Sequence, residues 1–300
     1  MIITENLVKN FDGFLAVNNI SCNIPNGCIY GMVGSNGAGK STFLRLITGV
    51  YKADSGNIII DDEPVYENPK IKSRISYVPD DLFFLPNANI KRMASFYNNI
   101  YESFDNERCR FLTETFKIDT NKSINTFSKG MKRQAAIILA LSCKTDYMFF
   151  DETFDGLDPV MRNLVKSLIC QDVLERKATA FITSHSLREL EDICDQLALL
   201  HQGGLILESD ISNLKTSQFK VQIAFTHPFD EELFKDISYK RFKKVGSVAT
   251  MLVKGDMDET IAKLNTLNPS LLDVLPLTLE EVFTFEMGAL GYDFENILEG

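Results

Sequence analysis

The stretch Gly34–Thr42, with the sequence GSNGAGKST, decides the fold of this chain. Two glycines with four residues between them are followed by a lysine and a hydroxyl residue, which is the pattern of a phosphate-binding loop. The apolar run Cys28–Val33 before it predicts a buried strand, and Phe43–Ile47 after it has helical spacing. A glycine-rich loop that opens a helix offers unpaired backbone N–H groups to an anion. The sequence therefore predicts a nucleotide-binding α/β protein.

Each residue type in this loop has a physical role. Gly34, Gly37 and Gly39 are expected to let the backbone approach phosphates where a Cβ would clash. Lys40 can reach β- and γ-phosphate oxygens, and the Ser41 hydroxyl can ligate Mg²⁺. The other loop residues expected to contact the nucleotide are Ser35, Asn36, Ala38 and Thr42. The alternative, a glycine-rich turn with an incidental lysine, is disfavoured by the strand and helix on either side.

Composition and charge exclude several classes of protein. A length of 300 residues predicts one large domain or two ordinary ones. The hydrophobic fraction of 45% is enough for a folded core. The net charge of −10 argues against a protein that coats nucleic acid, so no nucleic-acid partner is expected. The six cysteines form no C-x-x-C pair, which favours free thiols in a reducing compartment. Since no signal peptide or membrane-spanning run is apparent, any membrane role is expected to come through a partner.

The pattern of predicted elements is that of an α/β frame with a helical insert. Residues 1–25 alternate between short apolar and polar runs and predict a β-rich start. Helical patterns dominate residues 87–142. Strands return at Tyr147–Phe150 and Thr179–Thr183 with a helix around Val160–Gln171 between them, and this βαβ order predicts a parallel sheet.

The pattern changes after about Leu214, so we predict a first domain of residues 1–214 and a small α+β accessory domain of residues 215–300. Thr278 and Glu281 have the spacing of a capping box. Strands are expected at Val221–Phe225 and Ala249–Val253, and helices at Met257–Leu267 and Leu279–Phe285. A regulatory module, a tail that stabilises a dimer and a clasp for a membrane partner all remain open as its role.

Polar residues follow two of the predicted parallel strands, where ligands bind in such sheets. Asp151 comes directly after a buried strand and can hold Mg²⁺, and Glu152 can polarise an attacking water. His185 follows the next strand and can hydrogen-bond a γ-phosphate oxygen. The alternative for Asp151 and Glu152 is that they are two solvated charges at the end of a strand. The alternative for His185 is a structural role.

A second candidate anion site precedes the basic helix near residue 131. Ser128 is a plausible N-cap, and Gly130 would expose backbone N–H groups in the first turn. In isolation this is an ordinary capped helix.

Together these motifs resemble the ATP-binding cassette family. The order and spacing of several motifs agree, and their conjunction is far more specific than any one of them. The matches are Gly34–Thr42 to Walker A, Phe149–Glu152 to Walker B, Phe127–Met131 to the position of the family signature, Gly156–Asp158 to the D-loop, His185 to the switch histidine and Phe11 to the aromatic residue that stacks on adenine.

The resemblance implies a P-loop fold with a RecA-like mixed sheet core, an N-terminal antiparallel β subdomain and a helical subdomain. It implies an ATPase that uses ATP and Mg²⁺ and works as two identical subunits head to tail. Each ATP would lie between Gly34–Thr42 of one chain and Ser128–Gly130 of the other. A separate membrane permease would be the second partner, holding the chain at the inner face of the cell membrane. The alternative is a soluble regulatory ATPase that is not coupled to transport.

Three positions depart from the family pattern. Asp80 stands where the family usually has a glutamine, so it is a third candidate metal ligand beside Ser41 and Asp151. Lys129 and Met131 replace the commoner Gly and Gln of the signature, and this variant looks similar to cassettes of ABC-2 and antibiotic-efflux exporters, which suggests export. The apolar run Leu82–Leu85 is either internal packing or a groove for a permease helix.

Overall fold

The computed structural model describes residues 1–211 and 218–289. They divide into two compact units, Met1–Glu208 and a second unit that begins at Ser209. The domain boundary expected between residues 214 and 215 lies outside the described residues.

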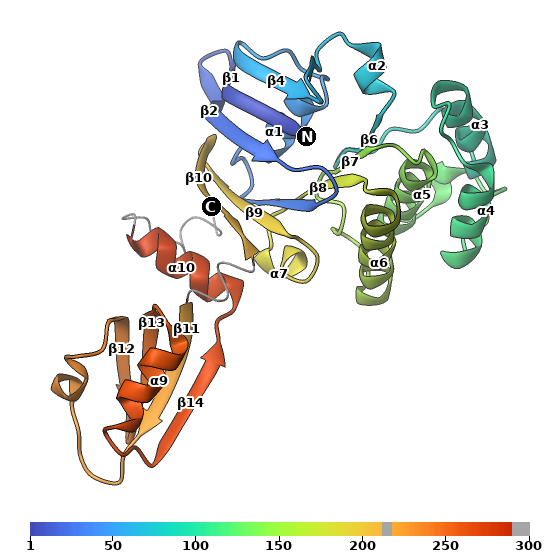
Figure 1. The fold of residues 1–300 in the computed structure, drawn as a ribbon. Coiled ribbons are helices and arrows are strands. Elements are labelled where there is room, and N and C mark those ends of the chain that lie inside the picture. Colours follow the sequence, from blue (N-terminus) through green and yellow to red (C-terminus); the bar gives the residue numbers. More distant parts are fainter. Residues whose placement is uncertain (212–217, 290–300) are drawn as a thin grey trace. The chain divides into compact units, whose positions relative to one another are not determined.

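An antiparallel sheet begins the first unit (Figure 1). The strands are ordered β2-β1-β4-β5. The turn between the first two strands has Asp12 at φ +48° and Gly13 at φ +94°, as a tight hairpin requires. This turn sets Phe11 opposite Phe14 in the register. The bounds are β1 Ile2–Phe11, β2 Phe14–Ile24, β4 Ser55–Ile60 and β5 Glu63–Pro64.

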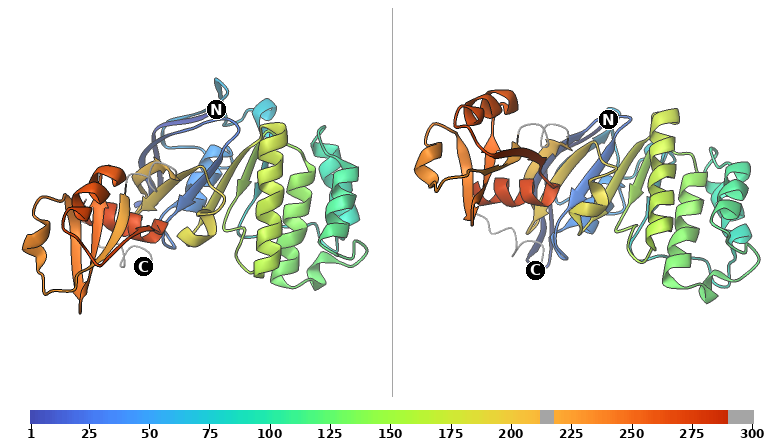
Figure 2. Two further views of the ribbon diagram at one scale, coloured as in Figure 1. Left: turned by 60° about the horizontal axis from the view of Figure 1, so that its bottom comes forward. Right: turned by 90° about the horizontal axis from the view of Figure 1, so that it is seen from below.

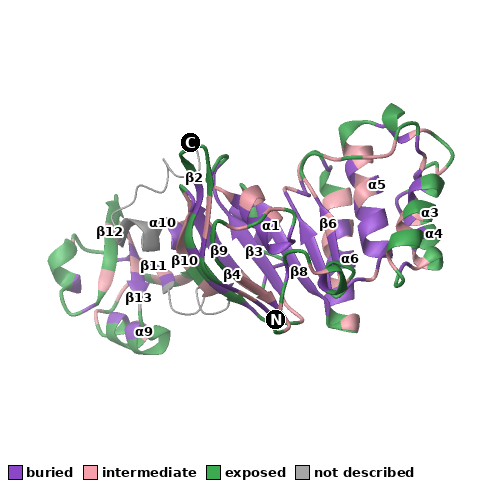
Figure 3. Ribbon diagram, turned by 90° about the horizontal axis from the view of Figure 1, so that it is seen from above, coloured by how far each residue is buried: buried purple, intermediate pink, exposed green. Residues whose placement is uncertain are grey.

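A six-stranded sheet forms the centre of the first unit, with the order β10-β9-β3-β8-β7-β6. Strands β9, β3, β8, β7 and β6 run parallel to one another. Every residue of β3, β7 and β8 is buried, as expected for parallel strands covered on both faces (Figure 3). The bounds are β3 Ile29–Val33, β6 Ile75–Val78, β7 Tyr147–Phe150, β8 Thr179–Ser184, β9 Gln196–His201 and β10 Gly204–Asp210. The predicted fold class, a mixed sheet with an antiparallel β subdomain and a helical subdomain, is confirmed.

Helices surround this sheet, and α3, α4 and α5 contact one another as a helical insert (Figure 2). The helix α6 connects β7 to β8. The bounds are α1 Lys40–Ile47, α2 Pro69–Lys72, α3 Ile90–Ile100, α4 Asn106–Thr115, η1 Ile124–Thr126, α5 Lys129–Ser142, α6 Pro159–Arg176 and α7 Leu187–Leu190. Within the described parts of the chain, no helix combines the length and apolarity needed to cross a bilayer.

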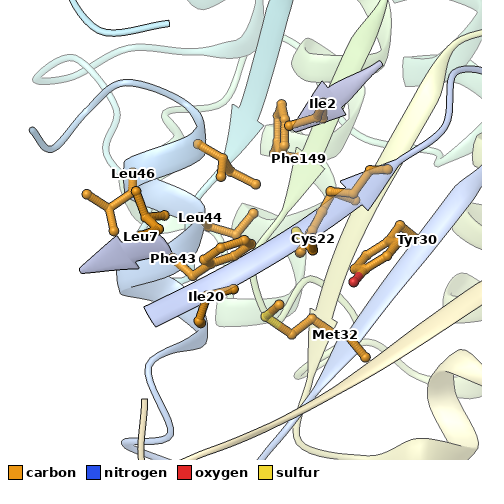
Figure 4. Packing of buried hydrophobic residues seen from close by; sticks show 14 of the residues in the cluster. Ile2, Leu7, Ile20, Cys22, Tyr30, Met32, Phe43, Leu44, Leu46 and Phe149 are labelled. Atoms are coloured by element: carbon orange, nitrogen blue, oxygen red, sulfur yellow. The ribbon is translucent and has the colours of Figure 1, made fainter. Parts of the chain in front are cut away.

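The core of the first unit anchors the helix that follows the phosphate loop. Phe43, Leu44 and Leu46 of α1 are fully buried in one cluster with residues of both sheets (Figure 4). The Phe181 ring of β8 lies 6.0 Å from the rings of both Phe43 and Phe149. Because close-packed interiors resist small shifts, this cluster fixes the first turn of α1 against the central strands.

The second unit contains an antiparallel sheet of order β12-β13-β11-β14, in which the helix α9 connects β13 to β14. This is the split β-α-β arrangement, with the first helix reduced to the single turn η2. The expected capping box is present, because Thr278 and Glu281 each accept a hydrogen bond from the other's backbone N–H, at 3.2 and 3.1 Å. The bounds are β11 Gln218–Ala224, η2 Glu231–Phe234, β12 Tyr239–Val245, β13 Val248–Lys254, α9 Met257–Asn265, β14 Leu271–Pro276 and α10 Leu279–Ala289.

All six cysteines are thiols rather than disulfides. Four are buried, namely Cys22, Cys109, Cys143 and Cys194, and the other two are partly exposed. Burial raises the pKa of Cys22 to about 12 and raises the pKa of Cys170 as well, because a thiolate is poorly solvated in apolar surroundings.

Candidate functional site

The phosphate loop follows β3 and is shaped by two glycines that pack against backbone carbonyls. A Cβ on Gly39, which has φ +107°, would lie 2.3 Å from the carbonyl oxygen of Ala16. A Cβ on Gly34 would lie 2.4 Å from the carbonyl oxygen of Leu200. Gly37 differs, because its own Cβ would meet nothing within 4 Å. Gly34 and Gly39 therefore hold the loop against the protein, and Gly37 leaves its outer side open.

The helix N-terminus behind the loop has no side-chain cap. Gly39 occupies the N-cap position of α1, whereas α3, α4 and α5 are capped by Asn89, Asp105 and Ser128. The first N–H groups of α1 therefore remain available to an anion. In the loop, Ala38 donates its N–H to the Ser35 carbonyl. Asn36 is exposed, and Ser41 and Thr42 are half-buried in the first turn.

Lys40 is the one cation of this loop, and its side chain is only 6% exposed. Its ammonium donates hydrogen bonds to the carbonyl oxygens of Gly34, at 2.5 Å, and Ser35, at 3.0 Å. It also lies 3.1 Å from Glu152 Oε1. A buried ammonium that is fully surrounded by oxygens is well suited to exchange some of them for phosphate oxygens.

Glu152 joins the loop to His185. Its other oxygen, Oε2, accepts from the His185 backbone N–H at 3.2 Å and lies 3.0 Å from Nδ1 of the same residue. Glu152 has φ +46°, the left-handed region, and so turns away from the direction of β7. The structure thus brings Lys40, Glu152 and His185 together at the carboxyl ends of β3, β7 and β8.

Asp151 lies beside this group and is completely buried. Oδ1 accepts a 2.7 Å hydrogen bond from the Thr183 hydroxyl, and Oδ2 lies 3.4 Å from the Tyr77 hydroxyl. Burial raises the pKa of Asp151, although hydrogen bonds from Thr183 and Ser41 oppose the shift. A buried carboxylate next to a serine hydroxyl is a donor set that suits Mg²⁺.

The third candidate metal ligand, Asp80, has another partner. Its Oδ1 accepts a 2.7 Å hydrogen bond from Arg133, a buried residue of α5. The same guanidinium donates to the Pro79 carbonyl at 2.9 Å. Metal ligation by Asp80 Oδ1 would therefore compete with this ion pair.

The candidate second anion site lies at the start of α5. The Ser128 hydroxyl accepts the Met131 N–H at 3.2 Å, an ordinary N-cap. A Cβ on Gly130 would lie 2.7 Å from the carbonyl oxygen of Gly156, and Lys129 lies 3.8 Å from Asp155. Among the described residues, no hydrogen bond or ion pair connects this helix start to the phosphate loop. It packs instead on the segment 155–156.

Phe11, the candidate adenine contact, is 39% exposed at the end of β1. Its ring meets that of Tyr51 edge to face with 5.6 Å between the centroids. The Lys9 ammonium lies 5.3 Å from the Phe11 centroid. One face of an aromatic pair is therefore held in place at the surface, as stacking on a base requires.

Three residues of this region were not predicted from the sequence: Thr183, Tyr77 and Arg133. Thr183 could have been found from the pairing of β7 with β8, because Phe150 lies opposite Ile182 and so Asp151 lies level with Thr183. Tyr77 lies one residue before the end of β6 and is paired with Phe149 of β7. Arg133 carries no comparable signal, since a basic residue in a helix is usually solvated.

Taken together, the donor set fits a magnesium-bound nucleoside triphosphate. An uncapped helix N-terminus and a buried ammonium suit phosphate oxygens. Asp151 and Ser41 suit the metal ion.

Comparison with known proteins agrees with this geometry. A family model described as ABC transporter matches residues 17–155. The ABC transporter ATP-binding protein YtrB of Bacillus subtilis is 31% identical over 96% of this chain and 98% of its own length. The bacitracin transport ATP-binding protein BcrA of Bacillus licheniformis is 32% identical over 72% of this chain and 71% of its own.

A solved structure described as the dimeric structure of a post-hydrolysis state of the ATP-binding cassette MJ0796, bound to ADP and Pi, has a similar fold. Its TM-score is 0.65 at 20% identity, covering 70% of this chain and 99% of that one.

Proposed function

Because this chain belongs to the family of ABC transporter ATP-binding proteins, we propose that it is an ATPase subunit that closes in pairs around MgATP and drives a separate membrane permease. ATP binding and hydrolysis are properties of this family, whereas the pairing, the permease and the direction of transport are parts of the proposal. The observation that carries it is the junction of Lys40, Glu152 and His185 beside the buried Asp151.

In this proposal each residue acts on one part of the substrate. Lys40 and the N–H groups of the loop bind the β- and γ-phosphates. Ser41 and Asp151 hold Mg²⁺, which neutralises charge that develops on the phosphates. Glu152 orients and polarises the attacking water, and His185 donates a hydrogen bond to the γ-phosphate. Asp80 would have to ligate the metal through Oδ2 or give up its Oδ1 bond to Arg133.

Binding of ATP also breaks an internal contact. Lys40 is held by Glu152 in this structure, so a phosphate that takes the ammonium frees the Glu152 carboxylate. In this proposal the Glu152 carboxylate is free to act on water only when ATP occupies the phosphate loop. This order suits an enzyme that hydrolyses ATP after binding it.

Stacking of adenine on Phe11 gives a testable affinity. We expect Phe11→Ala to weaken MgATP binding about tenfold, because stacking of a base on an aromatic ring contributes roughly 1–3 kcal/mol. Isothermal titration with MgATP measures the change. Phe14→Ala is the matched control, since Phe14 lies opposite Phe11 in the same hairpin and is 63% exposed. Equal affinities of the two variants would remove adenine stacking from the Phe11 ring.

The location of Ser128 and Gly130 supports the proposed pairing of two chains. They lie at a helix N-terminus that makes no described hydrogen bond or ion pair with the loop of the same chain, so in this proposal a second copy supplies them to a bound triphosphate. An isologous pair with two sites satisfies this requirement, because each copy offers one loop and one helix start. ATP then links the copies, and its hydrolysis lets them separate.

We expect Ser128→Arg to abolish ATP-dependent pairing while monomer binding stays within about threefold of normal, since a large cation would block a contact that only the closed pair makes. Sedimentation with MgATP, in a background that does not hydrolyse it, measures the pairing. Asn99→Arg adds the same charge at an exposed position of α3 and should pair normally. A Ser128→Arg chain that still pairs would exclude this interface.

The permease contact is proposed at Leu82–Leu85. Phe83 lies on the segment after β6, three residues beyond Asp80, and its side chain is 76% exposed. An apolar side chain is therefore exposed close in the chain to the candidate metal ligand Asp80. The permease would hold the subunit at the inner face of the membrane. The variant signature Lys129–Met131 supports an exporter, and the name of BcrA associates that relative with transport. Purification of the wild-type chain and of the Phe83→Asp variant from detergent extracts of membranes tests this contact. A membrane protein with several spans should copurify with the wild type in a stoichiometric amount, and it should be absent from the variant.

We propose residues 1–214 as the cassette and 215–300 as an accessory domain. The match to YtrB covers 96% of the chain, so it includes the accessory part, whereas the match to BcrA covers 72%. The similarity to YtrB therefore extends into residues 215–300.

A further inference from the structure

Thr183 lies at the carboxyl end of β8, in the middle of the central sheet, and is completely buried. Its hydroxyl donates to Asp151 Oδ1 at 2.7 Å. The same oxygen accepts the backbone N–H of Glu152 at 3.1 Å. One side chain thus contacts both residues that the proposed function assigns to the metal and to the attacking water.

The direction of these bonds is fixed. A hydroxyl has a single proton, and the acceptor-only carboxylate takes it, so the Glu152 N–H must meet a lone pair of the oxygen. Thr183 thereby holds Oδ1 of Asp151, while Oδ2 lies a long 3.4 Å from the Tyr77 hydroxyl. The Ser41 hydroxyl also hydrogen-bonds this carboxylate.

The second bond acts on the backbone of Glu152. This residue has φ +46°, a conformation that non-glycine residues adopt only where the surroundings hold it. The Thr183 hydroxyl supplies such a restraint at the Glu152 N–H. The turn directs the Glu152 carboxylate to Lys40 and His185 instead of along the strand.

A buried threonine in a strand often serves packing alone, because its branched side chain suits a pleated sheet. Thr179, at the other end of β8, offers a comparison. It is also buried, and its hydroxyl accepts the N–H of Gly27 at 3.0 Å, far along the strand from the site.

We propose that Thr183 is a positioning residue that acts through its one hydroxyl. As a donor, this hydroxyl orients the Asp151 carboxylate for the metal. As an acceptor, it holds the backbone turn of Glu152 that orients the Glu152 carboxylate for the attacking water. The proposal rests on the proposed function of this site. It predicts that the hydroxyl, and not the bulk of the side chain, carries the effect.

The test compares Thr183→Val, which keeps the shape and removes the hydroxyl, with Thr183→Ser, which keeps the hydroxyl. Thr179→Val is the matched control, and Thr183→Ala serves if the valine variant does not fold. Thermal melting reports the fold. Steady-state kinetics give kcat and KM for MgATP. Electron paramagnetic resonance measures binding of Mn²⁺, used in place of Mg²⁺, to the chain with ATP.

We expect Thr183→Val to lower kcat about tenfold or more and to weaken Mn²⁺ binding by a similar factor, since a hydrogen bond to a charged group is lost. ATP binding without metal should be unchanged. Thr183→Ser should recover both values to within about threefold, and Thr179→Val should lower only the melting temperature.

Two results would overturn the inference. In one, a folded Thr183→Val chain keeps wild-type kcat and Mn²⁺ affinity. In the other, Thr179→Val loses as much of both as Thr183→Val, which would reduce the effect to stability. Failure of the proposed function is distinguishable, because wild-type chain would then neither hydrolyse MgATP nor bind Mn²⁺ in an ATP-dependent way.

Discussion

Replacement of Lys40 by alanine should weaken binding of MgATP at least about a hundredfold, because two charge-assisted hydrogen bonds contribute about 1.5–3 kcal/mol each and a factor of ten corresponds to 1.4 kcal/mol. The Lys40 side chain is 6% exposed, so water screens its contacts with phosphate less than it would at the surface. Isothermal titration of the purified chain with MgATP measures the effect, and hydrolysis should fall with it.

The fold should survive this change. Loss of the ammonium leaves Glu152 with the backbone N–H and Nδ1 of His185 as partners, so its carboxylate is not left alone. Lys122→Ala, at an exposed lysine of the helical insert, is the matched control and should bind MgATP normally. Undiminished affinity of a folded Lys40→Ala chain would mean that the phosphates bind elsewhere.

Replacement of Glu152 by glutamine should stop turnover without loss of binding. We expect kcat to fall about 10²- to 10⁴-fold, the range that a general base contributes. Glutamine keeps the shape of the side chain and can still accept the His185 N–H. It no longer competes for Lys40, so MgATP should bind at least as tightly as in the wild type.

The same variant should accumulate as an ATP-bound pair, because the step that separates the copies no longer occurs. Size-exclusion chromatography with and without MgATP detects the pair, and a phosphate-release assay gives the rate. Glu175→Gln, on an exposed part of α6, should hydrolyse ATP at the wild-type rate and remain in exchange between the two states. Wild-type turnover by Glu152→Gln would assign the base to another residue.

Much of the central fold was predictable from the sequence, because parallel strands leave an unambiguous pattern. β3, β7 and β8 are buried on both faces, so each has an apolar segment, which in β8 is the run 180–182 between Thr179 and Thr183. Polar residues begin abruptly at their carboxyl ends, which is why Asp151, Glu152 and His185 could be placed at one edge of the sheet before the structure was known.

The second unit was only half predicted, and sheet position explains why. β11 and β13, which were expected, are the two inner strands, with alternating residues buried in the core. β12 and β14, which were missed, are the two edges. β12 has the sequence YKRFKKV, and its exposed basic residues, typical of an edge, obscure the alternation.

Contacts between residues that are far apart in the chain could not be predicted from the sequence either. The role of Gly34 and Gly39 was expected to be close approach to phosphate, yet the space beside each is filled by a carbonyl of a distant residue, Leu200 or Ala16. The ion pair of Arg133 with Asp80 joins residues far apart in the chain. Neither has a local pattern, because each arises from how two elements pack.

The burial of the thiols determines where a fluorescent dye can be attached to measure the distance between two chains. Maleimide dyes react with thiolates, and burial keeps Cys22, with its pKa of about 12, almost wholly protonated at neutral pH. Cys109, Cys143 and Cys194 are shielded in the same way. A cysteine introduced at the exposed Asn99 should therefore be modified well ahead of these four. Only the partly exposed Cys28 and Cys170 would need replacement before fluorescence energy transfer between two chains is recorded.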